Sequence, residues 1–355
     1  MILVISNMYP SDKYPNYGVF VKNFVDELSN SYETKVISIT KKESKKAKLF
    51  GYLHFYWLIT KNYIFGNFDL IYVHYAGYNA PPVLLGKLFN KKTPLIVNVH
   101  GSDVTPEKKL EERTNFLTRM LVHRADLTVV PSTYFQKVVV DKYGDVPTYV
   151  SPSSGINLSL FQPHQKRKNT DEFTLGYVSR IDQDKGWDIL LEAVHNLKKD
   201  IPNIRLIMVG GGAQENDAIK KIDDLKLNDY VTKIKMLSQS ELVEIYNSLD
   251  AFIFPSTRDG ESLGLVGLEA MACGIPVIGS DFGGIQTYTV DGHNGFLFKP
   301  GSCDDLEKKI MKFYRLNIQE RSEFSNNAIH TAANYDSNVV NERLIEKLAT
   351  HLNGR

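Results

Sequence analysis

Residues 251–280 read AFIFPSTRDGESLGLVGLEAMACGIPVIGS, and this stretch decides the fold. The apolar run 251–254 predicts a buried strand, a polar loop follows it, and the apolar residues from Gly264 onward predict a helix. Gly274 stands where the glycine after a helix end is expected, and Pro276 prevents the helix from continuing. A strand, a loop, a helix and a second strand in this order predict a βαβ unit of a parallel sheet.

The same alternation extends through the chain in two series. Each predicted strand is short, nearly continuously apolar and bounded by polar or turn residues, as strands buried on both faces of a parallel sheet are. The first series comprises residues 2–5, 35–39, 70–73, 95–99 and 127–130. The second comprises residues 173–178, 204–209, 231–236, 251–254 and 276–278. We therefore predict an α/β protein with two doubly wound, Rossmann-like domains and a cleft between the carboxyl ends of their strands.

Length and composition agree with two domains. A chain of 355 residues exceeds one ordinary domain, and the polar, basic segment 162–171 has the composition of a linker. We predict an N-terminal domain over residues 1–165, a linker over 166–171 and a second domain over 172–336.

Other classes of protein are excluded by the composition. Hydrophobic residues make up 43% and charged residues 23%, which is ordinary for a globular chain. The two cysteines, Cys273 and Cys303, are too few for a disulfide scaffold or a cysteine-based zinc site, and they favour a reducing compartment. No run of 18 apolar residues predicts a membrane span, and Met1 leads directly into a strand, so we expect no signal peptide.

The charge is distributed unevenly. Residues 1–170 carry 22 lysines and arginines against 13 aspartates and glutamates, whereas the remainder carries 20 against 28. This asymmetry favours an anionic partner for the first half, which could be nucleic acid, phospholipid or a phosphorylated substrate. The alternative is that the charged surface residues are distributed unevenly without any binding partner.

Candidate binding residues of the second half follow the strands, where open α/β sheets bind ligands. The helix predicted from Gly264 has free N–H groups at its start, around Leu265 and Val266, which suit a phosphate. Glu261 precedes this helix and Glu269 lies inside it, and either carboxylate could accept hydrogen bonds from sugar hydroxyls. The alternative makes Glu261 a helix N-terminal charge and Glu269 a solvated helix residue.

Further candidates lie in three other loops. Arg180 and Lys185 flank a strand-to-helix turn, a favourable position for binding a diphosphate, although loop cations are often only solvated. Gly18 opens the first helix, where it could admit a phosphate close to the backbone or simply form a turn. His100 ends the fourth strand and could face the cleft or be structural.

In this order and spacing the motifs resemble those of family 4 of the retaining glycosyltransferases, which have the GT-B architecture. The resemblance covers nearly the whole chain. It is carried by Gly18, His100, the segment 154–157 with Phe161, Arg180, Lys185-Gly186, Glu261 and Glu269 with seven residues between them, 270–278, Gly283-Gly284 and Asp291-Gly292.

The resemblance implies a role for each matching position. Arg180 and Lys185 would neutralise the donor diphosphate, and Gly18 would offer its backbone to the same phosphates. His100 would contact the donor hexose beside the reaction centre, and Glu261 would hold hydroxyls of the donor sugar. The amides around Gly264, Leu265 and Val266 would bind the sugar and phosphate, and Glu269 the ribose.

The family also implies the reaction. We expect a metal-independent hexosyltransferase without a cofactor that uses a nucleoside-diphosphate sugar, a UDP-sugar in preference to a GDP-sugar. The acceptor would be a glycan or lipid-linked intermediate of polysaccharide biosynthesis. The departures are Ser262-Leu263 in place of Gly-Phe, Thr287 in place of a glutamate, Asn157 in place of an aspartate, and Tyr17-Gly18 in place of a glycine pair.

Two alternatives remain. Another enzyme of the same fold, such as a nucleotide-sugar epimerase or a phosphorylase, would need a catalytic base or a pyridoxal phosphate lysine, for which no convincing site is found. A catalytically inactive sugar-nucleotide-binding partner is the other. By resemblance, the amphipathic segment 337–355 would pack back on the N-terminal domain.

A basic and aromatic segment, residues 41–59, carries the remaining prediction. Lysines followed closely by aromatic residues are typical of segments that lie on an anionic membrane surface, which would make the protein cytoplasmic and peripheral. The alternative is a solvated lysine loop followed by a buried helix. Nucleic acid is not expected, because no binding motif accompanies the charge.

Overall fold

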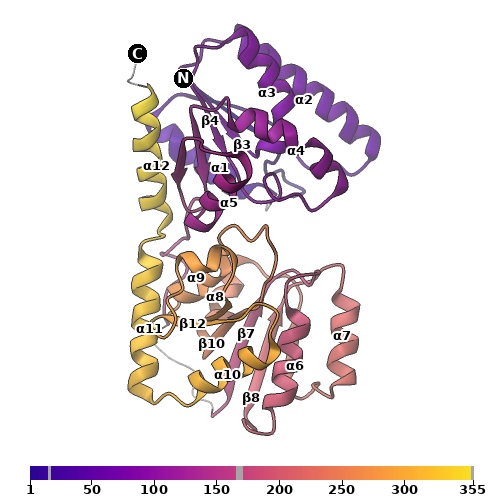
Figure 1. Ribbon diagram of the computed structural model, residues 1–355, viewed down its shortest axis with the longest axis vertical. Coiled ribbons are helices and arrows are strands. Elements are labelled where there is room, and N and C mark those ends of the chain that lie inside the picture. The colour runs from indigo at the N-terminus through magenta and orange to yellow at the C-terminus, as the bar shows by residue number, and fades with distance from the viewer. Residues whose placement is uncertain (15–16, 165–170, 353–355) are drawn as a thin grey trace. The chain divides into compact units, whose positions relative to one another are not determined.

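The computed structural model describes residues 1–14, 17–164 and 171–352, and the chain divides into two compact units (Figure 1). The first unit contains Met1–Gly155 and Asn338–Arg355, and the second contains Ile156–Ser337. The boundary thus precedes the one expected at residue 165, because Phe161 is buried in a core cluster of the second unit. Of the predicted linker 166–171, residues 166–170 lie outside the described residues.

The first unit contains a six-stranded parallel sheet in the order β2-β1-β3-β4-β5-β6. Its register pairs Ile2 with Thr34 on one side and with Leu70 on the other. The strands are β1 (Ile2–Ser6), β2 (Thr34–Ser38), β3 (Leu70–His74), β4 (Leu95–Asn98), β5 (Leu127–Val130) and β6 (Thr148–Val150). The helices are α1 (Val19–Ser31), α2 (Lys45–Phe65), α3 (Ala76–Phe89), α4 (Lys109–Val122), α5 (Thr133–Tyr143) and α12 (Ser337–Leu352).

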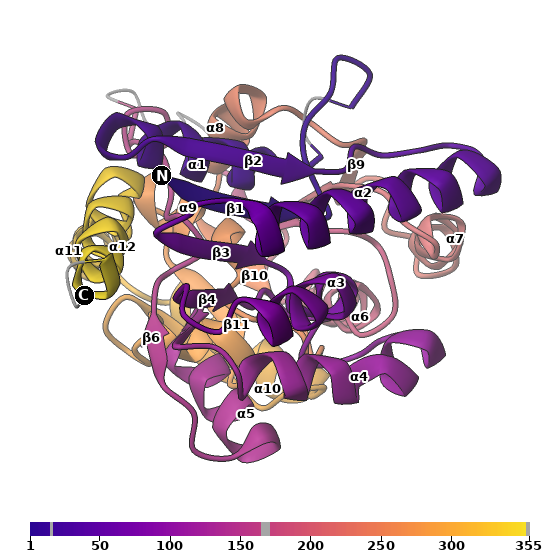
Figure 2. The ribbon, with the colours of Figure 1, turned by 90° about the horizontal axis from the view of Figure 1, so that it is seen from above.

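Helices cover both faces of this sheet. Alternate residues of β1 point to opposite faces, so Leu3 packs in a cluster with residues of α2, α3, α4 and α5, whereas Val4 packs with α1 and α12. The view from above shows α2, α3 and α4 on one side of the strands and α12 on the other (Figure 2). Leu344 and Leu348 of α12 are buried in the same cluster as Ile2 and Val4.

The second unit repeats this architecture with strand order β12-β11-β10-β7-β8-β9, again parallel. The strands are β7 (Phe173–Val178), β8 (Ile204–Val209), β9 (Val231–Ile234), β10 (Ala251–Phe254), β11 (Val277–Ser280) and β12 (Gly295–Phe298). The helices are α6 (Trp187–Leu197), α7 (Glu215–Asp224), α8 (Gln239–Asn247), α9 (Leu265–Ala272), η1 (Gly283–Thr287), α10 (Cys303–Tyr314) and α11 (Ile318–Ala333). Residues of α6, α7 and α10 fill one core cluster, and residues of α8, α9 and α11 fill the other.

The predicted α/β fold with two doubly wound sheets is confirmed, and every predicted strand is present. Two strands were missed: β6 has only three partly exposed residues, and the apolar run of β12 is only the three residues 296–298. Within the described residues, no helix combines the length and the apolar character needed to cross a bilayer.

The basic and aromatic segment adopts a structure that neither alternative described. The lysines at 45, 46 and 48 form the first turn of α2 rather than a loop, and Ser44 caps the helix by accepting the N–H of Ala47 at 3.1 Å. Only Phe55, Ile59 and Tyr63 of this helix are buried. The helix therefore has apolar residues on its exposed side as well as its buried side.

Leu348→Ala tests how far α12 stabilises the first unit. The side chain is fully buried, so the substitution should lower the free energy of unfolding of this unit by about 2–5 kcal/mol. Urea unfolding followed by circular dichroism measures this loss. In a Trp57→Phe background, fluorescence of the buried Trp187 reports the second unit alone and should keep its midpoint. The exposed Glu346→Ala is the control; equal effects of the two substitutions would contradict the packing.

Candidate functional site

In the second unit, two loops at the carboxyl ends of β7 and β10 lie against each other. The first leads from β7 to α6 and ends at Gly186, whose φ of +67° favours glycine. A Cβ built at Gly186 would lie 2.1 Å from the carbonyl oxygen of Pro255 in the second loop. Glycine at this position therefore allows the two loops to approach.

This approach brings Lys185 and Glu261 together. The Lys185 ammonium lies 2.5 Å from a carboxylate oxygen of Glu261, and both side chains are nearly buried, with exposed fractions of 10% and 15%. The Ser256 hydroxyl donates a hydrogen bond to the same carboxylate at 3.1 Å. Because a buried charge without a partner is costly, each of the two side chains fixes the other in place.

Arg180 belongs to the same β7–α6 loop but has a different partner. Its guanidinium lies 2.8 Å from the Asp182 carboxylate, and 53% of its side chain is exposed. The Asp182 carboxylate also accepts the backbone N–H of Ala213 at 2.8 Å. Arg180 is thus more exposed than Lys185 and more accessible to a ligand.

The start of α9 presents backbone N–H groups beside Glu261. Gly264 precedes the helix with a φ of +79°, and the Tyr288 hydroxyl donates to its carbonyl oxygen at 2.8 Å. The first N–H groups of a helix, here those of Leu265 and Val266, have no acceptor within the helix. Together with the helix dipole they make a position that favours an anion.

Glu269 is buried inside α9, so it is not the solvated helix residue of the alternative interpretation. The Tyr246 hydroxyl donates to its carboxylate at 2.9 Å. Burial raises the pKa of Glu269 to about 7, against the lowering effect of this hydrogen bond. A carboxyl with a single protein donor retains capacity to accept hydrogen bonds from a ligand.

His100 of the first unit pairs with a second histidine. Nε2 of His100 lies 3.2 Å from Nδ1 of His74, the last residue of β3. Burial lowers the pKa of His100 to about 3, and burial together with His100 lowers the pKa of His74 well below its usual value. Both imidazoles are therefore neutral near pH 7.

Gly18 begins α1 with a φ of +78°. A Cβ at this position would lie 2.7 Å from the Met8 carbonyl carbon, so only glycine lets the loop after β1 pass this close. Gly18 and His100 belong to the first unit, and the remaining predicted site residues belong to the second.

Sequence reasoning missed four polar residues of these sites: His74, Tyr246, Ser256 and Tyr288. His74 ends a strand as His100 does, so its position alone could have indicated it. Tyr246 reaches Glu269 from a helix that carries no motif, so only the packing reveals it. Tyr288 reaches Gly264 from the end of η1, and the nearby Gly283-Gly284 motif could have indicated it. Among the described residues, no three His, Cys, Asp or Glu side chains are grouped so that they could hold a metal ion.

Two family descriptions match the chain, one for each unit. "Glycosyl transferases group 1" matches residues 160–331, and "Glycosyltransferase Family 4" matches residues 17–153. The chain belongs to the family 4 glycosyltransferases.

Curated members of the family are distant in sequence. The D-inositol 3-phosphate glycosyltransferase of Stackebrandtia nassauensis is 28% identical over 76% of this chain and 65% of its own length. An uncharacterised glycosyltransferase of Methanocaldococcus jannaschii is 26% identical over 88% of this chain and 89% of its own. The chain thus matches slightly less than two thirds of the inositol phosphate enzyme.

Solved structures of this family share the fold. Sucrose-phosphate synthase from Thermosynechococcus elongatus superimposes with a TM-score of 0.80 at 19% identity, covering 99% of this chain and 98% of that one. HepE from Anabaena, crystallised with UDP and glucose, gives a TM-score of 0.77 at 20% identity, with coverage of 99% and 100%. These matches identify the two sheets as the GT-B fold.

The histidine pair predicts an acid-sensitive first unit. Below pH 6.5 the unfolded histidines bind protons that the folded pair does not, so stability falls by up to about 1.4 kcal/mol per pH unit for each histidine. At pH 5 the loss would be about 2 kcal/mol for each. Hydrogen exchange of β3 and β4 amides at pH 7 and 5, corrected for intrinsic rates, measures it.

His74→Phe should remove about half of this pH dependence, and the exposed His123→Gln should leave it unchanged. The second unit provides an internal reference, because the contribution of Glu269 to its stability changes with pH in the opposite direction. Its Glu269 has a raised pKa, so the folded state binds the proton more readily and this group stabilises the unit as the pH falls. A first unit as stable at pH 5 as at pH 7 would contradict the burial of two neutral imidazoles.

Proposed function

We propose that this family 4 glycosyltransferase is a retaining, metal-independent hexosyltransferase. It transfers a hexose from a nucleoside-diphosphate sugar, with UDP favoured as the nucleotide, to a hydroxyl of a lipid-linked or cell-surface glycan intermediate. The observation that carries the proposal is the Lys185–Glu261 pair beside the free N–H groups at the start of α9. This arrangement combines a cation, a carboxylate and an anion-binding helix end at one edge of the sheet.

Each group suits one part of the donor. Lys185 and the exposed Arg180 supply positive charge for the diphosphate, and the Leu265 and Val266 amides donate hydrogen bonds to it. Glu261 is positioned by Lys185 and Ser256 to accept hydrogen bonds from sugar hydroxyls. Glu269 accepts them from the ribose, and Gly18 and His100 complete the phosphate and hexose contacts from the first unit.

In the proposed reaction, the bond from the sugar's anomeric carbon to the diphosphate oxygen breaks, and a bond to the acceptor oxygen forms on the same face. The acceptor's proton passes to the departing phosphate oxygen, so no separate base is needed. Negative charge grows on the diphosphate in the transition state, which is where cations and helix amides stabilise most. Two cationic side chains would then take the part of a divalent metal ion.

The comparisons support the donor and acceptor classes. HepE has been crystallised with UDP and with UDP-glucose. CapM of Staphylococcus aureus, a capsular polysaccharide biosynthesis glycosyltransferase, is 31% identical over 44% of this chain. An enzyme that builds such surface glycans would meet its acceptor at the cytoplasmic face of the membrane.

Lys185→Met and Arg180→Met should each lower transfer by about 100-fold or more, because each removes a charge that acts mainly in the transition state. Release of UDP from a panel of UDP-sugars in the presence of acceptor measures the rate. Lys199→Met is the matched control, since this lysine is exposed on the same unit. Circular dichroism must accompany Lys185→Met, because that substitution leaves the nearly buried Glu261 without its cation.

Near-normal transfer by either folded variant would refute the diphosphate assignment. Full loss of transfer on adding a chelator, restored by a divalent ion, would refute metal independence. Donor binding without UDP release at any acceptor would instead favour the inactive binding partner. Formation of an epimeric nucleotide-sugar would favour an epimerase.

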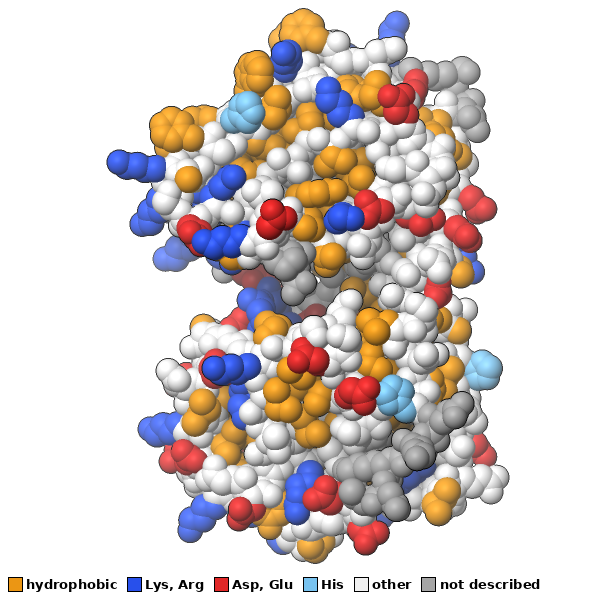
Figure 3. All heavy atoms as spheres, turned by 180° about the vertical axis from the view of Figure 1, so that it is seen from behind, with side chains coloured by type: hydrophobic (Ala, Val, Ile, Leu, Met, Phe, Trp, Pro, Cys, Tyr) orange, Lys and Arg blue, Asp and Glu red, His pale blue; other side chains and the backbone are white. Residues whose placement is uncertain are grey.

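We also propose that the exposed side of α2 binds an anionic membrane surface. Leu49, Phe50, Leu53 and Trp57 have exposed fractions of 55–68%, and the Lys61 ammonium lies 4.9 Å from the centre of the Trp57 ring. The space-filling view shows hydrophobic and basic side chains side by side along the outer edge of the first unit (Figure 3). Apolar and aromatic residues can enter the interface while lysines contact lipid phosphates.

Co-sedimentation with vesicles of graded phosphatidylserine content tests the membrane proposal. Binding should rise with anionic lipid and fall with salt, because each lysine near the surface adds about 1 kcal/mol. Replacing Lys41, Lys42, Lys45 and Lys46 by glutamine should remove most of it. Replacing the exposed lysines 137, 199, 220 and 235, a control with the same change of charge, should not. A wild type that stays in the supernatant on fully anionic vesicles at low salt would exclude this surface.

A further inference from the structure

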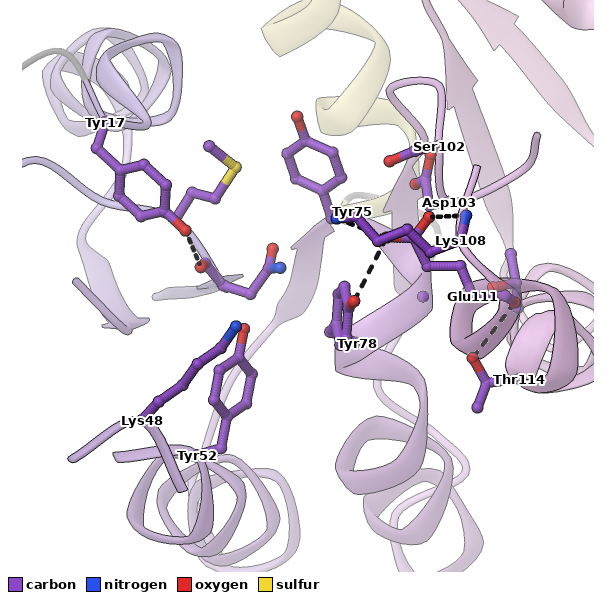
Figure 4. A pocket seen from close by; sticks show the side chains of 14 residues that line it. Tyr17, Lys48, Tyr52, Tyr75, Tyr78, Ser102, Asp103, Lys108, Glu111 and Thr114 are labelled. Atoms are coloured by element: carbon purple, nitrogen blue, oxygen red, sulfur yellow. Dashed lines mark hydrogen bonds and ion pairs between the residues drawn. The ribbon is translucent and has the colours of Figure 1, made fainter. Parts of the chain in front are cut away.

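A cavity of about 270 Å³ lies within the first unit and uses none of the proposed donor-binding residues (Figure 4). It is formed by the segments that follow β1, β3 and β4 and by the helices α2 and α4. Tyr75 and Asp103 line it and also hold His100. The ring centres of Tyr75 and His100 lie 4.4 Å apart, and the Asp103 carboxylate accepts the His100 backbone N–H at 3.0 Å. The cavity is therefore adjacent to the histidine proposed to contact the transferred hexose.

Tyrosines form its walls. Tyr17 and Tyr52 extend toward the cavity from one side and Tyr75 and Tyr78 from the other, as Figure 4 shows. A phenol combines an apolar face with a hydroxyl, which suits the C–H faces and hydroxyl rim of a sugar ring. Tyr75 adopts this position with a φ of +65°, a strained conformation that proteins retain mainly at functional sites.

Asn7 adds an unused acceptor to the lining. The residue is only 7% exposed, and its Oδ1 has no hydrogen-bond partner among the described residues. A buried amide oxygen that accepts no hydrogen bond costs free energy, and such atoms are rare in native proteins. A hydroxyl of a bound sugar could donate to it.

The cavity also contains a cation without a carboxylate partner. Its two acids are occupied, since Asp103 accepts the backbone N–H groups of Ala76 and Gly101 in addition to that of His100. Glu111 accepts the Lys108 N–H and lies 3.5 Å from the Lys108 ammonium. Lys48, by contrast, has no ion pair or hydrogen bond from its ammonium to any residue that the structure describes.

Lys48 lies in the first turn of α2, where lysine is locally unfavourable. That turn contains Lys45 and Lys46 as well and no acidic residue, so like charges meet at the positive end of the helix dipole. A sequence that breaks a local rule without a compensating partner among the described residues indicates a functional constraint. An anion bound at Lys48 would relieve the repulsion.

We propose that this cavity binds a phosphorylated sugar or polyol as the acceptor, with its phosphate at Lys48, its ring among the tyrosines and a hydroxyl at Asn7. The lining contains two lysines and no arginine, which fits a phosphate held by a point charge better than a carboxylate held by a planar fork. The proposal rests on the proposed transferase function, since it names the acceptor of that reaction. The phosphate belongs either to a free sugar phosphate or to the headgroup of a sugar-bearing lipid.

Binding of acceptor probes without any donor tests the cavity separately from the reaction. The probes are glucose 1-phosphate, glucose 6-phosphate, inositol 1-phosphate, the parent glucose and inorganic phosphate, and calorimetry or ligand-observed NMR on the full chain gives the Kd. At least one sugar or polyol phosphate should bind at least about 10-fold more tightly than glucose and inorganic phosphate. Lys48→Met should abolish this preference, since a charged hydrogen bond is worth a tenfold change or more.

Lys137→Met is the control, because it removes the same charge from an exposed position of the same unit and does not line the cavity. It should leave the Kd unchanged, and Lys48→Arg should restore binding in part. If soluble probes fail, phosphatidylcholine vesicles with and without a polyprenyl-phosphate sugar replace them, and additional binding to the sugar lipid that Lys48→Met removes and Lys137→Met keeps assigns the phosphate to a lipid.

Equal losses in Lys137→Met and Lys48→Met would overturn the proposal in favour of the general charge of the unit. So would the absence of Lys48-dependent binding of both soluble and lipid-linked phosphates. Failure of the transferase proposal would look different. The probes would still bind through Lys48, but no UDP would be released, and Lys185→Met would not alter their Kd.

Discussion

The sites depend on one constraint, which is that the central strands of both sheets are parallel and buried on both faces. Such strands can carry almost no polar side chains along their length, so polar groups concentrate where the strands end. Because parallel strands end at the same edge, side chains from distant parts of the sequence meet there. The loops after β7 and β10 bring Lys185 to Glu261 in this way, and the residues ending β3 and β4 bring His74 to His100.

At these edges, burial determines the protonation states. The Lys185 ammonium and the Glu261 carboxylate lie 2.5 Å apart, so each supplies the other's counterion. Burial keeps the two histidines neutral by lowering their pKa values, and it raises the pKa of Glu269 to about 7. The carboxyl ends of the strands therefore carry an ion pair in the second unit and a pair of neutral imidazoles in the first.

Helix α2 shows how one element can serve several surfaces. Phe55, Ile59 and Tyr63 anchor it to the core, Lys48 and Tyr52 line the cavity, and Phe50 and Trp57 remain exposed. A helix with apolar residues on opposite sides has little amphipathic contrast, which is why its sequence could not show which side is buried. An acceptor with a lipid anchor would be able to use both the cavity and the exposed side.

The sequence by itself determined the fold class, the strands of both series and the family. A continuous apolar run between turn residues predicts a buried parallel strand without any knowledge of which strands lie beside it. The spacing of Glu261, Glu269 and Gly274 can likewise be recognised within one short stretch of sequence. Tertiary structure decided which residues meet. The Lys185–Glu261 pair joins residues 76 positions apart, and Tyr246 reaches Glu269 across 23. The acceptor cavity likewise draws Asn7, Lys48 and Tyr75 from three separate segments. Such contacts arise from the packing of loops and helices over the sheet, which leaves no periodic trace in any single stretch of sequence.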